Sequence, residues 1–222
     1  MAGRALATTE ATRASTAPPT TKGERTAERI LDAAEVLFAE RGFEGASMRE
    51  IARQAGIQQP GLYNHFPGKQ ALYAAVLARA LQPMADALRA WDGGDAPSAA
   101  ATQLPALMTD LLFEHPQMAA LFQQALQGDG RSVGTRLLRR WLDRLFGEGL
   151  AGLERLAAQL GWQDLDRRDL ALQVVAMFNV TTGYFLSQRA LDAMKAGRLE
   201  DPDNVERQKR LLERVALAAL GR

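Results

Sequence analysis

The sequence predicts an all-α fold, in which a three-helix head containing a helix-turn-helix precedes a larger helical domain. From residue 26 onward, apolar residues recur at the three- and four-residue spacings of a helix with one buried face. Nowhere does a sustained alternation of apolar and polar residues occur together with hairpin turns. Ala and Leu are abundant, whereas Trp, Tyr and Phe total only 14 of the 222 residues, and this bias favours helices over strands.

Capping residues and glycines predict where the three helices of the head begin and end. Gly42 suits a left-handed position after the first helix. A capping box opens the second helix, because the Ser47 oxygen can accept from the Glu50 N–H while the Glu50 side chain reaches back. Gly56 ends that helix. The ranges predicted for the three helices are 26–42, 47–56 and 58–66, within a domain at 24–70.

The second domain is expected to cover residues 71–222. A long helix from Lys69 to Trp91 leads into it, and Pro83 should kink that helix. Further helices are predicted near 98–114, 117–127, 133–160, 167–195 and 203–220.

Residues 1–23 are rich in Ala, Thr and Pro and contain no apolar segment of the kind that a secretory signal needs. We interpret this segment as a disordered arm, either inert or touching DNA with its basic residues. The uncharged run at 170–188 contains several amide and hydroxyl side chains, so a buried helix fits it better than a membrane span. A cytoplasmic protein without a membrane partner is therefore expected.

The residue inventory excludes several classes of enzyme. There is no cysteine and only two histidines, His65 and His115, so neither a metal site nor a cofactor is expected. The segment Gly147–Gly152 matches the dinucleotide-binding spacing GxGxxG, but helical spacing precedes it where the fingerprint requires a strand. Close helix packing or a local bend explains these glycines better. We predict that the chain is not an enzyme.

The two short helices around Gly56 have the arrangement of a DNA-binding helix-turn-helix, whose second helix enters the major groove. Gly61 would let that helix approach the bases closely, and glutamine can pair bidentately with adenine. Residues 45–80 carry net charge +3 from Arg49, Arg53, Lys69 and Arg79 against Glu50, which is a modest electrostatic footprint. The polar side chains predicted on the second helix are Gln58, Gln59, Tyr63, Asn64 and His65.

The stretch from Thr26 to Tyr73 resembles the DNA-binding domain of the TetR family, the tetracycline-repressor-like transcriptional regulators. The matching segments are Ile30–Ala34, Leu37–Phe43, Ser47–Ala52, Ala55–Ile57 and Leu62–Phe66, followed by Lys69 and Leu72.

The resemblance implies two groups of DNA contacts. The group expected on the phosphate backbone is Ser47, Arg49, Tyr63 and Lys69. The group expected at the base-reading face is Gln59, Pro60 and Gly61. Arg49 could also reach a base edge, and His65 either a phosphate or a base. Two departures matter: Gln58 stands where the family usually has a Ser or Thr cap, and the missing side chain of Gly61 shifts base reading to Gln58, Gln59 and Asn64.

The resemblance also implies that the second domain binds an effector and forms a homodimer. Asn179 is the preferred polar contact in the pocket, because a buried amide needs partners; His115, Gln123 and Thr182 are weaker candidates, and His115 fits a turn better. The predicted pocket residues are Leu107, Met108, Leu111, Phe122, Trp141, Leu145, Met177, Phe178, Asn179, Thr181 and Tyr184. The predicted dimer contacts are Ala176, Gly183, Leu186, Leu211, Leu212 and Val215.

We therefore predict a dimeric regulator of transcription, a repressor that a small apolar or amphipathic molecule releases from double-stranded operator DNA. The alternative is a small-molecule-binding or interaction protein on the same scaffold with weak operator binding. That alternative rests on Gly61 and on the modest positive charge. The sequence names neither the effector nor the operator, and an activator remains open.

Overall fold

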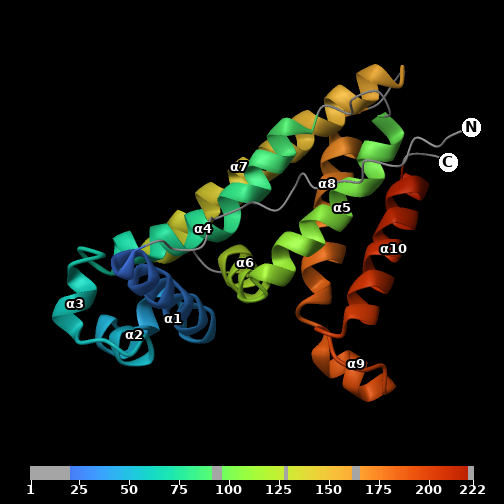
Figure 1. Ribbon diagram of the computed structural model, residues 1–222. Coiled ribbons are helices and arrows are strands. Elements are labelled where there is room, and N and C mark those ends of the chain that lie inside the picture. The colour runs from blue at the N-terminus through green and yellow to red at the C-terminus, as the bar shows by residue number, and fades with distance from the viewer. Residues whose placement is uncertain (1–20, 92–96, 128–129, 162–165, 220–222) are drawn as a thin grey trace, which may run out of the picture.

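The computed structural model describes residues 21–91, 97–127, 130–161 and 166–219, and throughout these ranges the regular elements are helices (Figure 1). The all-α prediction is therefore confirmed for the part of the chain that is described. The helices are α1 (Lys22–Gly45), α2 (Met48–Gln54), α3 (Gln59–Tyr63), α4 (Lys69–Ala90), α5 (Pro97–Glu114), α6 (Gln117–Gln127), α7 (Val133–Gln159), α8 (Arg167–Tyr184), α9 (Gln188–Met194) and α10 (Pro202–Ala219).

The first helix begins four residues earlier than the sequence pattern predicted. Thr21 forms a complete capping box with Glu24: its hydroxyl accepts from the Glu24 N–H at 3.1 Å, and the Glu24 carboxylate accepts from the Thr21 N–H at 3.0 Å. Residues 22 and 23, which the sequence pattern placed in a disordered arm, are therefore helical. The rest of that arm, residues 1–20, lies outside the described residues.

The head, made of α1, α2 and α3, has a densely packed core that also includes the start of α4. Phe38 and Tyr73 meet edge to face with ring centroids 4.8 Å apart, and Phe43 lies 5.1 Å from Tyr73. Gly134 at the start of α7 packs directly on Phe43, where a Cβ atom would come within 2.1 Å of the Phe43 Cβ. The head is therefore held by both long helices, α4 and α7.

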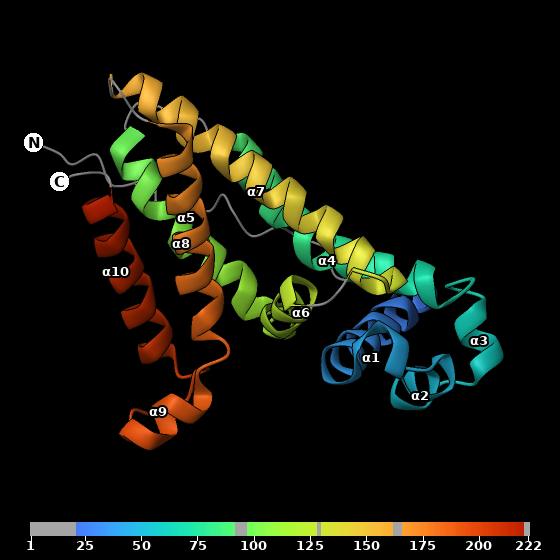
Figure 2. The ribbon, with the colours of Figure 1, turned by 180° about the vertical axis from the view of Figure 1, so that it is seen from behind.

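Helices α4 and α7 run side by side and connect the head to the body, which consists of α5, α6, α8, α9, α10 and the far half of α7 (Figures 1 and 2). α4 is continuous through Pro83, where a kink was predicted. A proline removes one helical hydrogen bond, and the buried Leu81, Met84 and Ala85 hold the helix in place on both sides of it.

The GxGxxG segment lies within α7, as the helical spacing before it indicated. A Cβ atom on Gly149 would lie 3.3 Å from Val174 of α8, and one on Gly152 would lie 2.5 Å from the Trp91 ring. The prediction of close packing is therefore confirmed for Gly149 and Gly152. A Cβ atom on Gly147 would meet nothing within 4 Å.

The single helix predicted over 167–195 is two helices, α8 and α9, which meet at an angle of 64°. Near the break, the Ser187 hydroxyl donates to the Gly183 carbonyl at 2.6 Å, and the Thr182 hydroxyl donates to the Phe178 carbonyl at 2.7 Å. Such hydroxyls give helical carbonyls an alternative partner and often bend helices. Within the described ranges, no helix on its own combines the length and the apolar character of a membrane span; α8 and α9 do so only when joined across their bend.

Candidate nucleic-acid interface and internal cavity

The start of α2 is fixed by Ser47, although the capping box is only half formed. The Ser47 hydroxyl accepts from the Glu50 N–H at 3.2 Å and donates to the Glu50 carboxylate at 2.7 Å. The predicted bond from the Glu50 carboxylate back to the Ser47 N–H is replaced by this contact with the hydroxyl. The hydrogen bond from Ser47, together with the Arg41 guanidinium, holds the pKa of Glu50 below its ordinary value.

Helix α3 presents its polar side chains to solvent. Gln58 has an extended backbone and makes no side-chain cap, in agreement with the weakened cap that its departure from Ser or Thr implies. The side chain of Leu62 is fully buried and attaches α3 to the core. A Cβ atom on Gly61 would meet nothing within 4 Å, so the backbone of α3 is accessible at that point. The exposed side chains here are Gln58, Gln59, Pro60, Tyr63 and Asn64, and His65 is half-buried.

Lys69 is more engaged within the protein than its predicted phosphate contact implies. Its ammonium donates to the Glu44 carbonyl at 3.0 Å and lies 4.7 Å from the centroid of the Phe43 ring. These contacts tie the start of α4 to the end of α1. A DNA phosphate would therefore share the ammonium with the Glu44 carbonyl.

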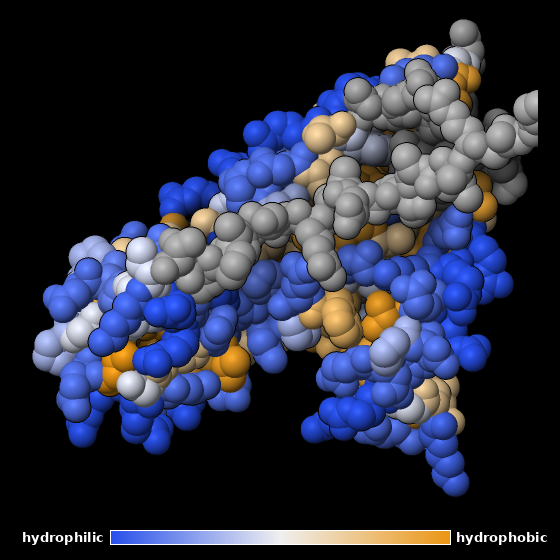
Figure 3. Space-filling view, viewed as in Figure 1, coloured by the Kyte–Doolittle hydropathy of each residue, from blue (hydrophilic) through white to orange (hydrophobic). Residues whose placement is uncertain are grey.

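Arg49 and Arg53 are the exposed cations of α2, and within the described residues neither has an ion-pair partner. Arg79 differs from them, since three carboxylates of α1 surround its guanidinium. The local charge of +3 counted from the sequence therefore overstates what is free to meet DNA. Figure 3 shows hydrophilic residues over most of the head, while hydrophobic residues gather on the body above α9.

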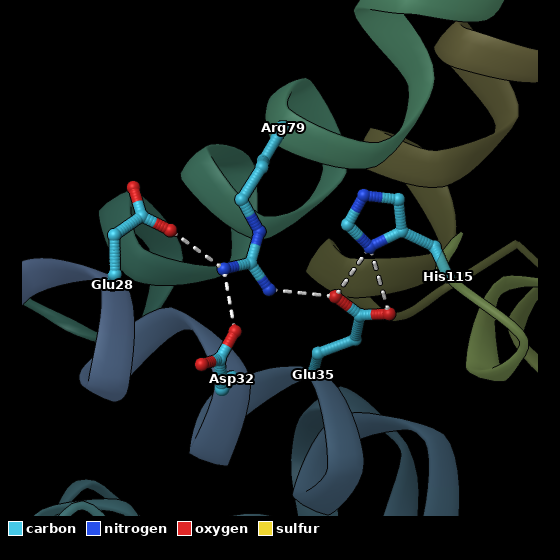
Figure 4. A network of polar contacts seen from close by, with 5 residues as sticks. All are labelled: Glu28, Asp32, Glu35, Arg79 and His115. Carbon is cyan, nitrogen blue, oxygen red and sulfur yellow. Dashed lines mark hydrogen bonds and ion pairs between the residues drawn. The ribbon is translucent and has the colours of Figure 1, made fainter. Parts of the chain in front are cut away.

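A charged network joins the head to the body (Figure 4). The Arg79 guanidinium of α4 lies 3.1 Å from the Glu28 carboxylate, 2.8 Å from that of Asp32 and 2.8 Å from that of Glu35. The imidazole of His115, between α5 and α6, lies 3.0 Å from Glu35. Because Glu28, Asp32 and Glu35 follow one another at spacings of four and three, they share one face of α1.

Glu35 is the centre of this network, with a side chain only 7% exposed. Burial alone would raise its pKa, but the hydrogen bond with His115 and the charge of Arg79 outweigh burial and lower the pKa. His115 lies in the turn between α5 and α6, as predicted, and its imidazole contacts Glu35 and not the cavity. Sequence reasoning missed this network, although the helical spacing of the three acids was visible.

The body contains a cavity of about 160 Å³, partly open to solvent and walled by α4, α5, α6, α7, α8 and α10. Its wall is almost wholly apolar and includes no charged residue among those described. The residues with a polar group in the wall are Gln173, Thr181, Thr182 and Trp91. Such a shape and composition fit a small-molecule site.

Six of the predicted pocket residues line this cavity, namely Met108, Phe122, Leu145, Met177, Phe178 and Thr181. Leu107, Leu111, Trp141, Asn179 and Tyr184 do not. Asn179 is exposed on the outer face of α8, so the expectation of a buried amide is wrong. The Tyr184 hydroxyl donates to the Leu199 carbonyl at 2.7 Å instead. Gln123 is exposed as well.

The helix from Lys69 to Trp91 was expected to border the pocket, but none of its residues was among those predicted to line it. Met84, Leu88 and Trp91 all line it, at spacings of four and three. Their spacing predicts only the inner face of a core helix, because periodicity does not distinguish a core from a cavity wall.

An apolar face on α8 and α10 is open to solvent. Leu172 is 66% exposed, and Val175, Leu186 and Leu211 are each more than 40% exposed. Of the predicted dimer contacts, Ala176, Leu186 and Leu211 are exposed, Gly183 borders open space, and Val215 is half-buried. Leu212 is fully buried within the chain and cannot belong to this face, because α10 turns that side toward the core.

Comparison with known proteins supports the resemblance of the head. Residues 30–76 match the family model described as "Bacterial regulatory proteins, tetR family". The HTH-type transcriptional regulator RutR of Escherichia coli (strain K12) is 33% identical over 134 residues, which cover 60% of this chain and 59% of RutR. The HTH-type transcriptional activator FasR of Mycolicibacterium smegmatis is 41% identical over 68 residues, 31% of each chain.

The fold is shared over a longer stretch than the sequence similarity. The TetR family transcriptional regulator PfmR from Thermus thermophilus superimposes with a TM-score of 0.64 at 23% identity, covering 87% of this chain and all of that one. The sequence match to RutR, by contrast, spans about three fifths of that protein. The named relatives are regulators, in agreement with the prediction that this chain is not an enzyme.

Proposed function

Because the chain belongs to the tetR family of bacterial regulatory proteins, we propose that it is a DNA-binding transcriptional regulator that responds to a small molecule in its cavity. One observation carries this proposal: a single helix, α4, starts beside the DNA-reading α3 and ends in the cavity wall. Its first residue, Lys69, contacts the end of α1, and its last turn contributes Leu88 to the cavity, with Trp91 just beyond. A molecule that displaces the end of α4 therefore acts on the head.

We assign α3 to the major groove of operator DNA. Its exposed amides, Gln58, Gln59 and Asn64, suit direct reading of base edges. The unpaired guanidiniums of Arg49 and Arg53, together with the exposed Tyr63 hydroxyl, suit phosphate contacts that set the position of α3. Lys69 and Ser47 contribute less, since both already bond within the protein. DNA as the target implies a cytoplasmic location.

A second copy of the chain would cover the apolar face on α8 and α10. The exposed face extends over Leu172, Val175 and Val180 of α8, Leu186 just after that helix, and Leu211 of α10. Burial of these side chains would contribute about 25 cal/mol per Å² of apolar surface removed from water. Two copies related by a twofold axis would present two α3 helices to successive major grooves.

The effector would act by favouring a dimer whose α3 helices no longer match those grooves. Such an effector would release a repressor from its operator. FasR, which is 41% identical to this chain over 68 residues, is called an activator, and the same DNA-binding mechanism would serve an activator. Effector and operator must weaken each other's binding by the same factor.

The alternative, a ligand-binding protein with weak operator binding, has two observations in its favour. Gly61 offers no side chain to the bases, and Arg79 is committed to the network with α1. A gel shift with the DNA upstream of the chain's own gene separates the two functions. Regulation predicts a discrete complex that survives competitor DNA and weakens in Arg49→Ala; the alternative predicts only complexes that competitor DNA removes.

A further inference from the structure

We propose that the protein binds a phosphate ion in a second pocket, between the head and the start of α7. This pocket has a volume of about 160 Å³, is partly open to solvent and lies apart from the cavity assigned to the effector. The end of α1, together with α4, α6 and the start of α7, forms its wall. The polar or charged residues of the described wall are Arg41, Glu44, Tyr73, Gln124, Ser132 and Thr135.

The first observation is an unpaired hydroxyl group in the wall. The Tyr73 side chain is only 2% exposed, its ring packs against Phe38 and Phe43, and its hydroxyl has no hydrogen-bond partner among the described residues. The unpaired side-chain atoms that are fully enclosed within those residues belong to Arg79 and Trp91 alone, so the Tyr73 oxygen keeps some accessible surface. Because Tyr73 borders this pocket, we place its hydroxyl at the pocket surface.

The second observation is the N-terminus of a long helix at the same pocket. Helix α7 has 27 residues, and the first N–H groups of such a helix concentrate partial positive charge at its start. The Ser132 hydroxyl caps this end by accepting from the Thr135 N–H at 3.0 Å, and it lies 3.1 Å from the Thr135 hydroxyl. Both residues border the pocket. The positive end of α7 and the unpaired Tyr73 hydroxyl therefore meet in one place.

The charge around the pocket favours an anion. Residues 130–142, which include the start of α7, contain four arginines and no acidic residue. On the other side of the pocket, one nitrogen of the Arg41 guanidinium pairs with Glu50 of α2, and its other N–H groups have no partner within the described residues. Glu44 is the acidic residue of the described wall, and it is exposed, so its carboxylate can turn to water. The net positive charge attracts anions to this pocket.

The free groups of the wall are mostly donors, which indicates a ligand with several acceptor oxygens. Burial raises the pKa of the Tyr73 hydroxyl, so this group stays protonated and can donate. The Gln124 amide uses one N–H to donate to the Ala39 carbonyl at 3.0 Å and keeps the second. Arg41 adds a charged donor, which forms the stronger kind of hydrogen bond with an anion. Phosphate offers these donors more acceptor oxygens and more negative charge than a carboxylate does.

Binding is tested by isothermal titration calorimetry of the full chain with inorganic phosphate at neutral pH, while sodium chloride keeps the ionic strength constant. We expect saturable binding at one site per chain with a Kd below about 1 mM. Acetate, titrated in the same way, should bind at least about fivefold more weakly, because it has fewer oxygens and a single charge.

Two matched pairs of variants locate the site. Tyr73→Phe keeps the aromatic packing of the head and removes only the hydroxyl, and it should weaken phosphate binding at least about tenfold. Its control is Tyr184→Phe, which removes a hydroxyl that bonds to the Leu199 carbonyl. Arg41→Gln should also weaken binding at least about tenfold, whereas Arg89→Gln, at another exposed arginine in an ion pair, should not.

Three results would overturn the proposal: no saturable phosphate binding to the wild-type protein, equal affinity in the wild type and Tyr73→Phe, or acetate binding as tightly as phosphate. Circular dichroism of Tyr73→Phe shows whether it is folded, and Arg41→Gln tests the same pocket without changing the core. The proposal depends on neither the effector cavity nor DNA binding. A protein that forms no operator complex in a gel shift would contradict the proposed function and leave the phosphate site standing.

Discussion

The two halves of α4 are held in different ways. In the head, Leu72, Val76 and Leu77 are fully buried and Tyr73 is 2% exposed, with its ring edge to face against Phe38. In the body, the last two turns of the same helix and the residue beyond them border a cavity of about 160 Å³. One end of α4 therefore lies in a close-packed core, and the other end lies beside empty space.

This difference shows how a ligand in the body could act on DNA at a distance. Close-packed interiors transmit a displacement because they compress little, whereas a cavity allows more than one arrangement of its wall. In the proposed mechanism, a ligand that fills the cavity displaces the body end of α4, and the head moves with the start of α4 because it is closely packed on it. The Arg79 network lies between the close-packed end and the cavity end of α4, and it connects α4 to α1 and to His115.

The largest expected effect comes from the body, without any change to the head. Ala176→Glu places a carboxylate on the exposed apolar face of α8, where a second copy would bury it unpaired. We expect dissociation to monomers in sedimentation equilibrium and a fall of at least about 100-fold in operator affinity, because one half-site remains. Ala158→Glu, at an exposed site on α7, is the matched control. A wild-type protein that is monomeric at micromolar concentration would contradict the interface.

The second prediction compares the packing of the head with the packing of the cavity wall. Leu72→Ala in the head should lower the free energy of unfolding by about 2–5 kcal/mol, since a fully buried leucine leaves a new cavity. Leu153→Ala removes the same atoms from the wall of a cavity that already exists. Its cost should be less than half as large in urea denaturation. Equal costs would mean that the cavity wall is as tightly packed as the head.

The third prediction concerns the Arg79 network, which lies between the head and the cavity. Arg79→Met leaves the buried Glu35 carboxylate without the guanidinium that pairs with it, which should cost about 3–5 kcal/mol at neutral pH. Arg89→Met, in an exposed pair with Asp86, should cost less than about 1 kcal/mol.

The pH dependence of stability shows whether the ionised form of Glu35 stabilises the fold. The pKa of Glu35 is lowered in the folded protein, so its contribution is present above the ordinary value near 4.5 and disappears as the pH falls through the lowered value. In Arg79→Met that pKa rises, and the acid loss of stability should begin at higher pH than in the wild type. Identical acid profiles in thermal unfolding would show that Arg79 does not stabilise the ionised form of Glu35.

The head was predictable from sequence because its signals are local. The Ser47 cap, the missing cap at Gln58 and the buried Leu62 each follow from residues a few positions apart. The errors in the body are non-local. Asn179 was expected inside and lies outside, and Leu212 was expected outside and lies inside, because both faces of their helices carry apolar residues. Pairing of His115 with Glu35 across 80 positions has no local signal at all.

The smallest effects separate two kinds of DNA contact within the head. Gln59→Ala should weaken binding by about 1–3 kcal/mol at one base pair and leave nonspecific binding nearly intact, since an exposed amide reads a base edge. Arg49→Ala should instead weaken operator and nonspecific DNA alike, and reduce the slope of log K against log[salt] by about 1. Neither substitution touches the cavity, so the affinity of the cavity for an apolar fluorescent probe should stay unchanged in both. If Gln59→Ala altered probe binding in the absence of DNA, the head and the body would not be the separate regimes that the packing of α4 indicates.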